Sequence, residues 1–170
     1  PHQQGARYRN RLLAPGWPDA CAQLQGKELS FINLLDGQAA WSMVRRFTEP
    51  ACVIVKHANP CGVALGTDIL DAYTRAFACD DVSAFGGVVA CNREIDEVTA
   101  ETIASVFTEV VLAPGFTDAA RAVLAPKVNL RLLVVDPSVP DATDELDVRR
   151  IDGGYLAQEA DIVDTDRTGW

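Results

Sequence analysis

A lysine and a histidine stand side by side in the segment VIVKHANPCGVALGTD, which covers residues 53–68. A lysine is charged at neutral pH and a histidine titrates near it, so these residue types suit charge stabilisation and proton transfer. The pair ends an apolar, β-branched run, and ligands of open α/β sheets bind outside the carboxyl ends of strands. Neighbouring side chains of a strand point to opposite faces, so Lys56 and His57 share a site only if the backbone leaves strand geometry. The alternative is a surface lysine beside a histidine that caps the strand.

Three other features of the sequence have both a structural and a functional interpretation. Pro60 biases the residue before it away from helix, and Gly62 permits a close backbone approach to a ligand, so both would bend the chain. In the segment SAFGG, Gly86 suits a helix C-cap, but a glycine loop before a strand also suits a binding site. Glu109 lies between apolar residues at the start of an expected strand, where it either faces solvent or pairs with a cation in a site. Spacing alone leaves the function open.

The chain alternates between strand and helix patterns. A helix is expected at about 36–47, with Asp36 as its N-cap, and another near 67–77. Continuous β-branched runs predict strands that are covered on both faces. These strands have the sequences ACVIVKH, GGVVAC, EVVLA and LRLLVV, and two more helices are expected at DEVTAETIASVF and TDAARAVLA. The alternation indicates an α/β fold, a three-layer sandwich with a mostly parallel sheet.

The composition is that of a globular chain. Its 170 residues are 48% hydrophobic and 23% charged, which suits about one domain with its own core. No apolar run approaches the ~18 residues of a membrane span and no export signal is present, so a soluble, cytoplasmic protein without a membrane partner is expected. A formal charge of −9 disfavours nucleic acid as a partner. Five cysteines without a C-x-x-C pair indicate neither a disulfide framework nor a zinc site.

The chain is expected to divide into three parts. Residues 1–135 form the α/β core, and residues 136–150, rich in proline and acidic residues, form a loop. Residues 151–170 are expected to supply an edge strand and the start of a further segment. Both ends lie in polar segments without a terminating element, so the chain is expected to be a piece of a larger protein.

Five blocks of the sequence occur in the order and approximate spacing of a known family. They are PHQ at 1–3, GKELSFINLLDGQAAW at 26–41, VKHANPCGVALG at 55–66, DDVSAFGGVVACNREID at 80–96 and FTEVVLAPGF at 107–116. The chain resembles the first half of the aminoimidazole carboxamide ribonucleotide formyltransferase domain of the bifunctional purine-biosynthesis protein, which also carries an IMP cyclohydrolase domain. The resemblance covers nearly the whole chain and implies a cytidine-deaminase-like fold.

The resemblance implies transfer of a formyl group from 10-formyltetrahydrofolate, as co-substrate and without a metal, to the 5-amino group of the ribonucleotide. That amine is a weak nucleophile because its lone pair is delocalised, so the reaction needs proton removal and oxyanion stabilisation. By resemblance, His57 takes part in removing the amine proton and Lys56 stabilises charge on the formyl oxygen. The matching positions imply nucleotide contacts at Phe85, Gly86 and Glu109.

Further expectations concern substrate and assembly. His2 matches a histidine that lies beside the substrate, and Asn59 is another candidate for substrate binding. The family forms homodimers with folate sites at the subunit interface, so a homodimer is expected. The arginine that holds the nucleotide phosphate and the second half of the domain, which supplies much of the folate site, are not among these residues. The 170-residue chain alone is therefore not expected to catalyse the transfer.

Two other functions are open alternatives. A zinc deaminase needs H-x-E followed by P-C-x-x-C, but His57 is followed by Ala58 and Asn59, and no cysteine stands three positions after Cys61. A module of the same fold that binds the nucleotide or serves assembly, without catalysis, needs only part of the site. Metal content would identify the first, and binding without turnover would identify the second.

Overall fold

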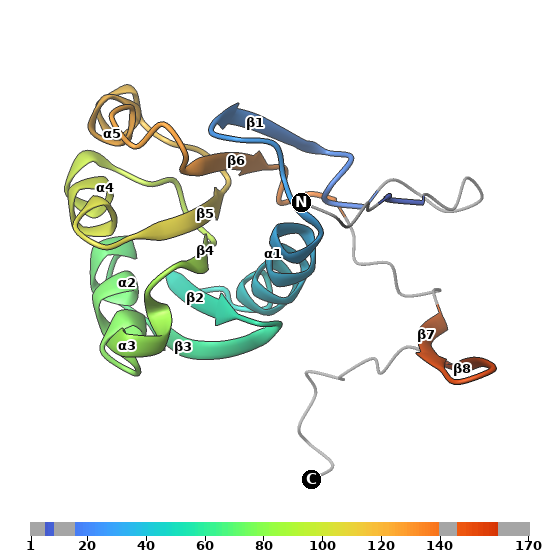
Figure 1. Cartoon of the computed structure of the whole chain (residues 1–170). Helices are drawn as coiled ribbons and strands as arrows, with labels where there is room; N and C mark the ends of the chain where they lie inside the picture. Colours follow the sequence, from blue (N-terminus) through green and yellow to red (C-terminus); the bar gives the residue numbers. More distant parts are fainter. Residues whose placement is uncertain (1–5, 9–15, 140–145, 160–170) are drawn as a thin grey trace, which may run out of the picture.

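The computed structural model describes residues 6–8, 16–139 and 146–159, and its centre is a six-stranded sheet (Figure 1). The strand order is β1-β6-β5-β4-β2-β3. The strands are β1 Cys21–Gln25, β2 Ala51–Lys56, β3 Asn59–Leu65, β4 Gly87–Cys91, β5 Thr108–Ala113 and β6 Arg131–Val135. β4, β5 and β6 are parallel, whereas β1, β2 and β3 pair antiparallel with their neighbours. The sheet is therefore mixed, with a parallel core of three strands.

Helices cover both faces of the sheet, which confirms the predicted three-layer α/β sandwich (Figure 1). The helices are α1 Phe31–Val44, α2 Ile69–Phe77, α3 Asp81–Ala84, α4 Glu97–Ala104 and α5 Asp118–Leu124. α1 packs on one face, and α2, α4 and α5 pack on the other. Each helix begins after a residue whose side-chain oxygen accepts an N–H of the first turn; these residues are Ser30, Asp68, Asp80, Asp96 and Thr117. Within the described ranges, no helix has both the length and the apolar character to cross a membrane.

The two helical layers create two hydrophobic cores, one on each side of the sheet. Successive residues of a strand point to opposite faces, so β2 contributes to both cores. Val53 and Val55 belong to the core beneath α1, whereas Cys52 and Ile54 belong to the core beneath α2 and α4. This double coverage explains why β2 is apolar without alternation.

The Asn-Pro-Cys-Gly segment was the expected bend after β2, but the structure places it in the edge strand β3. The bend lies earlier, because β2 and β3 form a hairpin whose two-residue turn is His57-Ala58. The proline is tolerated because β3 is the edge strand of its sheet. Gly62 approaches a helix rather than a ligand, since a Cβ there would stand 2.0 Å from the carbonyl oxygen of Ala76 in α2. The glycine allows β3 to pack closely against α2.

Asp36 lies inside α1, so its prediction as the N-cap is wrong. The helix begins after Ser30, whose hydroxyl accepts the N–H of Asn33 at 3.2 Å while the Asn33 side chain accepts the N–H of Ser30 at 3.1 Å. This reciprocal capping box fixes the start of the helix. Asp36 is only 6% exposed, so its carboxylate is held among protein groups.

Two features outside the predicted pattern lie at the margins of the fold. The sequence does not predict β1, because this edge strand is largely exposed and lacks an apolar run. The strand expected at the edge of the main sheet instead belongs to a separate antiparallel hairpin, formed by β7 Leu146–Ile151 and β8 Gly154–Glu159 (Figure 1). β7 begins within the range 136–150 that was predicted as a loop, and Gly153, with a φ of 76°, lies in the hairpin turn.

Removal of one helix cap should weaken the fold by a moderate amount. Asp96 caps α4 by accepting the backbone N–H of Thr99 at 2.9 Å. Asp96→Ala leaves this N–H without its acceptor, so the free energy of unfolding should fall by about 1 kcal/mol. Urea titration followed by circular dichroism measures the change. Asp96→Asn keeps an oxygen acceptor and should lie close to the wild type; an equal loss in both variants would contradict the capping role.

Candidate functional site

The turn between β2 and β3 takes the backbone out of strand geometry directly after Lys56. His57 and Ala58 have φ angles of 56° and 61°, the left-handed conformation that non-glycine residues rarely adopt. Two such residues in succession are typical of a type I′ hairpin turn. Asp36 accepts two hydrogen bonds from this turn, from His57 N to Oδ2 at 3.3 Å and from Ala58 N to Oδ1 at 2.7 Å. The turn exposes His57 at the tip of the hairpin, next to Lys56.

Lys56 reaches the loop that precedes β4. Its ammonium group donates a hydrogen bond to the carbonyl oxygen of Phe85. Gly86 has a φ of 71°, and a Cβ there would stand 3.3 Å from Lys56 Nζ and 3.2 Å from the ring of Phe107. Phe85 is 59% exposed, and its ring packs against that of Phe107, with ring centroids 5.3 Å apart. Gly86 thus supplies both a left-handed backbone and space beside the lysine.

Glu109 is turned toward α1 by a β-bulge. The pairing of β4 with β5 skips Glu109, which makes it the extra residue of the bulge, and bulges re-aim side chains in this way. The carboxylate accepts a hydrogen bond from the side chain of Asn33 at 2.8 Å. It also forms an ion pair with Arg131, across 3.8 Å. Glu109 is therefore both partly exposed to solvent and paired with a cation.

These groups meet at one edge of the sheet, and the direction of β2 decides which edge it is. β2 runs antiparallel to β4, so the carboxyl end of β2 lies beside the amino ends of β4, β5 and β6. Gly86, Glu109 and Arg131 lie at or beside those amino ends. The rule that ligands bind at the carboxyl ends of parallel strands was the basis for expecting a site at Lys56, and it does not describe this edge.

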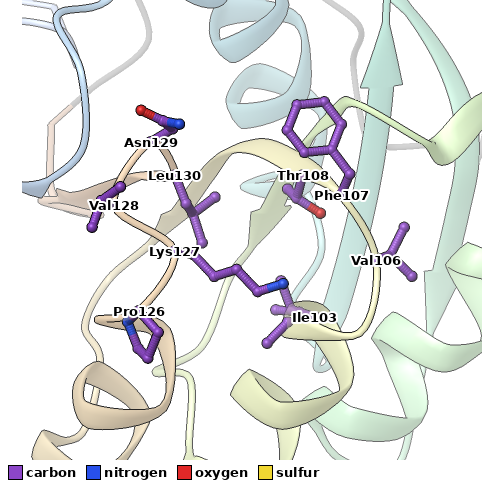
Figure 2. A pocket seen from close by; sticks show the side chains of 10 residues that line it. Ile103, Val106, Phe107, Thr108, Pro126, Lys127, Val128, Asn129 and Leu130 are labelled. Carbon is purple, nitrogen blue, oxygen red and sulfur yellow. The ribbon is translucent and has the colours of Figure 1, made fainter.

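A pocket of about 310 Å³ opens beside this group (Figure 2). The segment from α4 to β5 and the segment between α5 and β6 line it. Figure 2 shows the Lys127 side chain reaching across the pocket toward Ile103. Phe107 lines the pocket and also contacts Phe85, so the pocket and the loop around Gly86 share one wall.

The structure brings several predicted site residues together. Lys56 contacts the Phe85-Gly86 loop, and the N–H of Gly86 donates to the carbonyl oxygen of Phe107 at 2.7 Å, two residues before Glu109. Asn59 lies in the hairpin, where its amide donates to the carbonyl oxygen of His57 at 3.0 Å. The predicted residue His2 lies outside the described residues.

Three residues of this edge were not predicted as parts of a site. Asn33 and Asp36 are 2% and 6% exposed and lie three residues apart on α1, so they face the sheet together. Arg131 begins β6 and pairs with Glu109. Two polar residues at helical spacing in the apolar segment FINLLDGQAAW are the sequence signal that identifies the first two.

The neighbouring cysteine, Cys61 in β3, is partly buried. Burial raises the pKa of the Cys61 thiol, against the opposing effects of a backbone hydrogen bond and of the charge of Lys56. The thiol therefore stays protonated at neutral pH, and the thiolate is the reactive form. In the part of the chain that the structure describes, no three or more His, Cys, Asp and Glu residues are grouped to hold a metal ion.

Comparison with protein families decides where this chain belongs. The family model described as "AICARFT/IMPCHase bienzyme" matches residues 1–170. The chain belongs to this family. The resemblance inferred from the five sequence blocks is thereby confirmed, and it places the chain in a family of purine-biosynthesis enzymes.

Solved structures similar to this member of the AICARFT/IMPCHase family share little sequence with it. A protein described as a formate dehydrogenase accessory protein from Desulfotalea psychrophila has a TM-score of 0.45 and 7% identity, over 66% of this chain and 45% of its own. RibD from Acinetobacter baumannii has a TM-score of 0.42 and 13% identity, over 60% and 33%. A dCMP deaminase from the cyanophage S-TIM5 has a TM-score of 0.43 and 11% identity, over 61% and 98%. The chain spans less than half the length of the first two proteins.

Proposed function

We propose that this chain forms part of a formyltransferase site that moves a formyl group from 10-formyltetrahydrofolate to the 5-amino group of aminoimidazole carboxamide ribonucleotide, in IMP biosynthesis. The observation that carries the proposal is the contact of Lys56 with the Phe85-Gly86 loop, directly beside the exposed His57, in a chain of this family. A fixed cation and an imidazole at one edge are the groups that transfer of an acyl group to a weak amine requires.

The proposed reaction assigns one task to each of the two residues. The amine nitrogen attacks the formyl carbon, and the carbonyl electron pair moves to oxygen, which gives a tetrahedral oxyanion. The Lys56 ammonium stabilises this negative charge, and His57 accepts the proton that the amine loses. The bond between the formyl carbon and N10 of the folate then breaks, N10 takes up a proton, and tetrahydrofolate leaves.

The nucleotide is proposed to bind over Phe85, Gly86 and Glu109. The exposed ring of Phe85 offers a flat apolar surface to the imidazole base, and the absence of a side chain at Gly86 lets the ligand approach the backbone. Glu109 offers carboxylate oxygens whose position is fixed by Asn33 and Arg131. An acceptor held in this way loses little freedom when it binds a donor of the ligand.

A homodimer with folate sites at the subunit interface belongs to the same proposal. Its support is the outer side of α1, where Phe31, Ile32 and Leu35 are 68%, 47% and 44% exposed. A helix that is apolar on its outer side as well is typical of one that a partner covers. The alternative of a non-catalytic assembly module would use the same surface, so catalysis has to be tested directly.

The test of nucleotide binding uses Glu109 in the full-length protein that contains these residues. Glu109→Ala removes an acceptor and leaves Asn33 and Arg131 without their partner, so nucleotide affinity should fall about tenfold, the effect of a hydrogen bond to a charged group. Isothermal titration with the ribonucleotide measures the affinity, and tetrahydrofolate release measures turnover. Glu101→Ala, at an exposed acid of α4, is the control and should change neither. Equal affinities in all three proteins would remove Glu109 from the proposed site.

A further inference from the structure

We infer that Asp36 is a positioning residue for Lys56 and His57: its buried carboxylate holds the turn that presents them. The catalytic part of this inference rests on the proposed function, whereas the structural part rests only on hydrogen bonds. Oδ1 accepts the N–H of Ala58 at 2.7 Å and Oδ2 accepts the N–H of His57 at 3.3 Å. The two oxygens of one side chain thus serve two consecutive backbone groups.

The turn needs this support because its backbone conformation is unfavourable for its residues. The φ angles of 56° and 61° put His57 and Ala58 in the left-handed region, where a Cβ crowds the backbone. Hairpin turns of this type favour Asn-Gly or Gly-Gly for that reason. Strained backbone persists only where surrounding contacts hold it, and it occurs disproportionately at functional sites. The paired hydrogen bonds to Asp36 are such contacts.

The burial of Asp36 means that its carboxylate depends on hydrogen bonds from the protein. Asp36 is 6% exposed, and its neighbours on the helix are largely apolar. Burying a carboxylate costs free energy unless the carboxylate accepts hydrogen bonds. Asn33, three residues earlier on the same helix, donates a hydrogen bond from its side-chain amide to the carboxylate of Glu109. One face of α1 therefore contacts both the His57-Ala58 turn and the Glu109 carboxylate at the start of β5.

The substitution Asp36→Asn tests this role without changing the volume of the side chain. An amide offers one oxygen acceptor, so one of the two N–H groups of the turn loses its partner and meets an NH₂ group instead. We expect faster hydrogen–deuterium exchange in peptides that cover the turn, and a kcat for formyl transfer that falls on the order of 10- to 100-fold, as for small misplacements of reacting groups. The KM for the nucleotide should change much less, because its proposed contacts lie elsewhere.

A second substitution separates positioning from general damage. Ala58→Gly makes the left-handed conformation favourable at one of the two turn residues. In the full-length protein it should restore much of the kcat and of the slow exchange that Asp36→Asn loses, while changing little on its own. Asp96→Asn, the same change at a carboxylate that also accepts a backbone N–H but lies on α4, is the matched control and should leave kcat and turn exchange unaltered.

The outcomes distinguish this inference from the proposed function. Unchanged exchange at the turn in Asp36→Asn, or a loss of kcat that Ala58→Gly does not recover, overturns the positioning role. If formyl transfer is absent or insensitive to Lys56→Ala, the proposed function fails instead, and the exchange data still decide whether Asp36 holds the turn.

Discussion

Replacing Lys56 with alanine should lower the kcat for formyl transfer by a factor on the order of 10² or more, the size of a lost oxyanion or acid–base contact. The substitution removes the ammonium group, which donates a hydrogen bond to the carbonyl oxygen of Phe85 and belongs to the residue directly before His57. Folding should be little affected, because Lys56 ends β2 and is only partly buried. The measurement is the release of tetrahydrofolate by the full-length protein at saturating concentrations of both substrates. His57→Ala should give a comparable loss, since proton removal belongs to the same step.

The matched control for this prediction is Lys27→Ala. Lys27 is an exposed lysine in the loop after β1, so its loss changes the net charge by the same amount without touching the candidate site. Its kcat should stay within about twofold of the wild type, as expected for a surface substitution. Near-normal turnover in Lys56→Ala would leave the lysine with a structural role. Nucleotide binding without any turnover in the wild type would favour the non-catalytic module.

Gly62→Ala should cause a large loss of stability, about 3 kcal/mol or more. The new Cβ would stand 2.0 Å from the carbonyl oxygen of Ala76 and 2.8 Å from its carbonyl carbon. These are backbone atoms, so no side-chain rotation relieves the clash, and β3 must move away from α2. Because β3 also forms the hairpin that carries His57, activity should fall together with stability. Thermal unfolding followed by circular dichroism measures the effect.

Gly154→Ala provides the comparison, because nothing lies within 4 Å of a Cβ at that position and the backbone there has no positive φ. This variant should unfold within about 0.5 kcal/mol of the wild type, the range of neutral surface changes. Equal stabilities of the two glycine variants would mean that β3 and α2 do not approach each other as closely as the structure shows.

The parts of the fold that the sequence predicts well are those with a strong local signal. The continuous β-branched runs of β2, β4, β5 and β6 predict strands covered on both faces, and all four lie in one sheet. Asp68 and Thr117 sit at the starts of predicted helices and cap α2 and α5. The candidate site residues were identified by resemblance rather than by pattern, because a Lys-His pair and a Gly pair are too common to be specific.

The parts that the sequence does not predict depend on contacts between distant segments. The direction of β2 is one example, since a strand pattern is the same in either direction. The structure pairs β2 antiparallel with β3, across the turn at His57 and Ala58, and also antiparallel with β4. That turn lacks the usual glycine or asparagine, and its backbone N–H groups donate to Asp36 of another element. Asp36 itself resembles a helix cap in sequence, and only the packing of α1 against the sheet shows that it is buried.

The contacts that assemble the candidate site span long stretches of chain, and this has a consequence for how a ligand acts on the protein. The bond from Asn33 to Glu109 spans 76 residues, that from Lys56 to Phe85 spans 29, and that from Ala58 to Asp36 spans 22. Closing such loops costs conformational entropy, so the contacts form together with the whole sandwich and are absent from the unfolded chain. A nucleotide that binds at the proposed site would bind the native state alone, and at 100 times its dissociation constant it would add about 2.7 kcal/mol to the free energy of global unfolding. Bound nucleotide would then lower the fraction of molecules that are open to proteolysis.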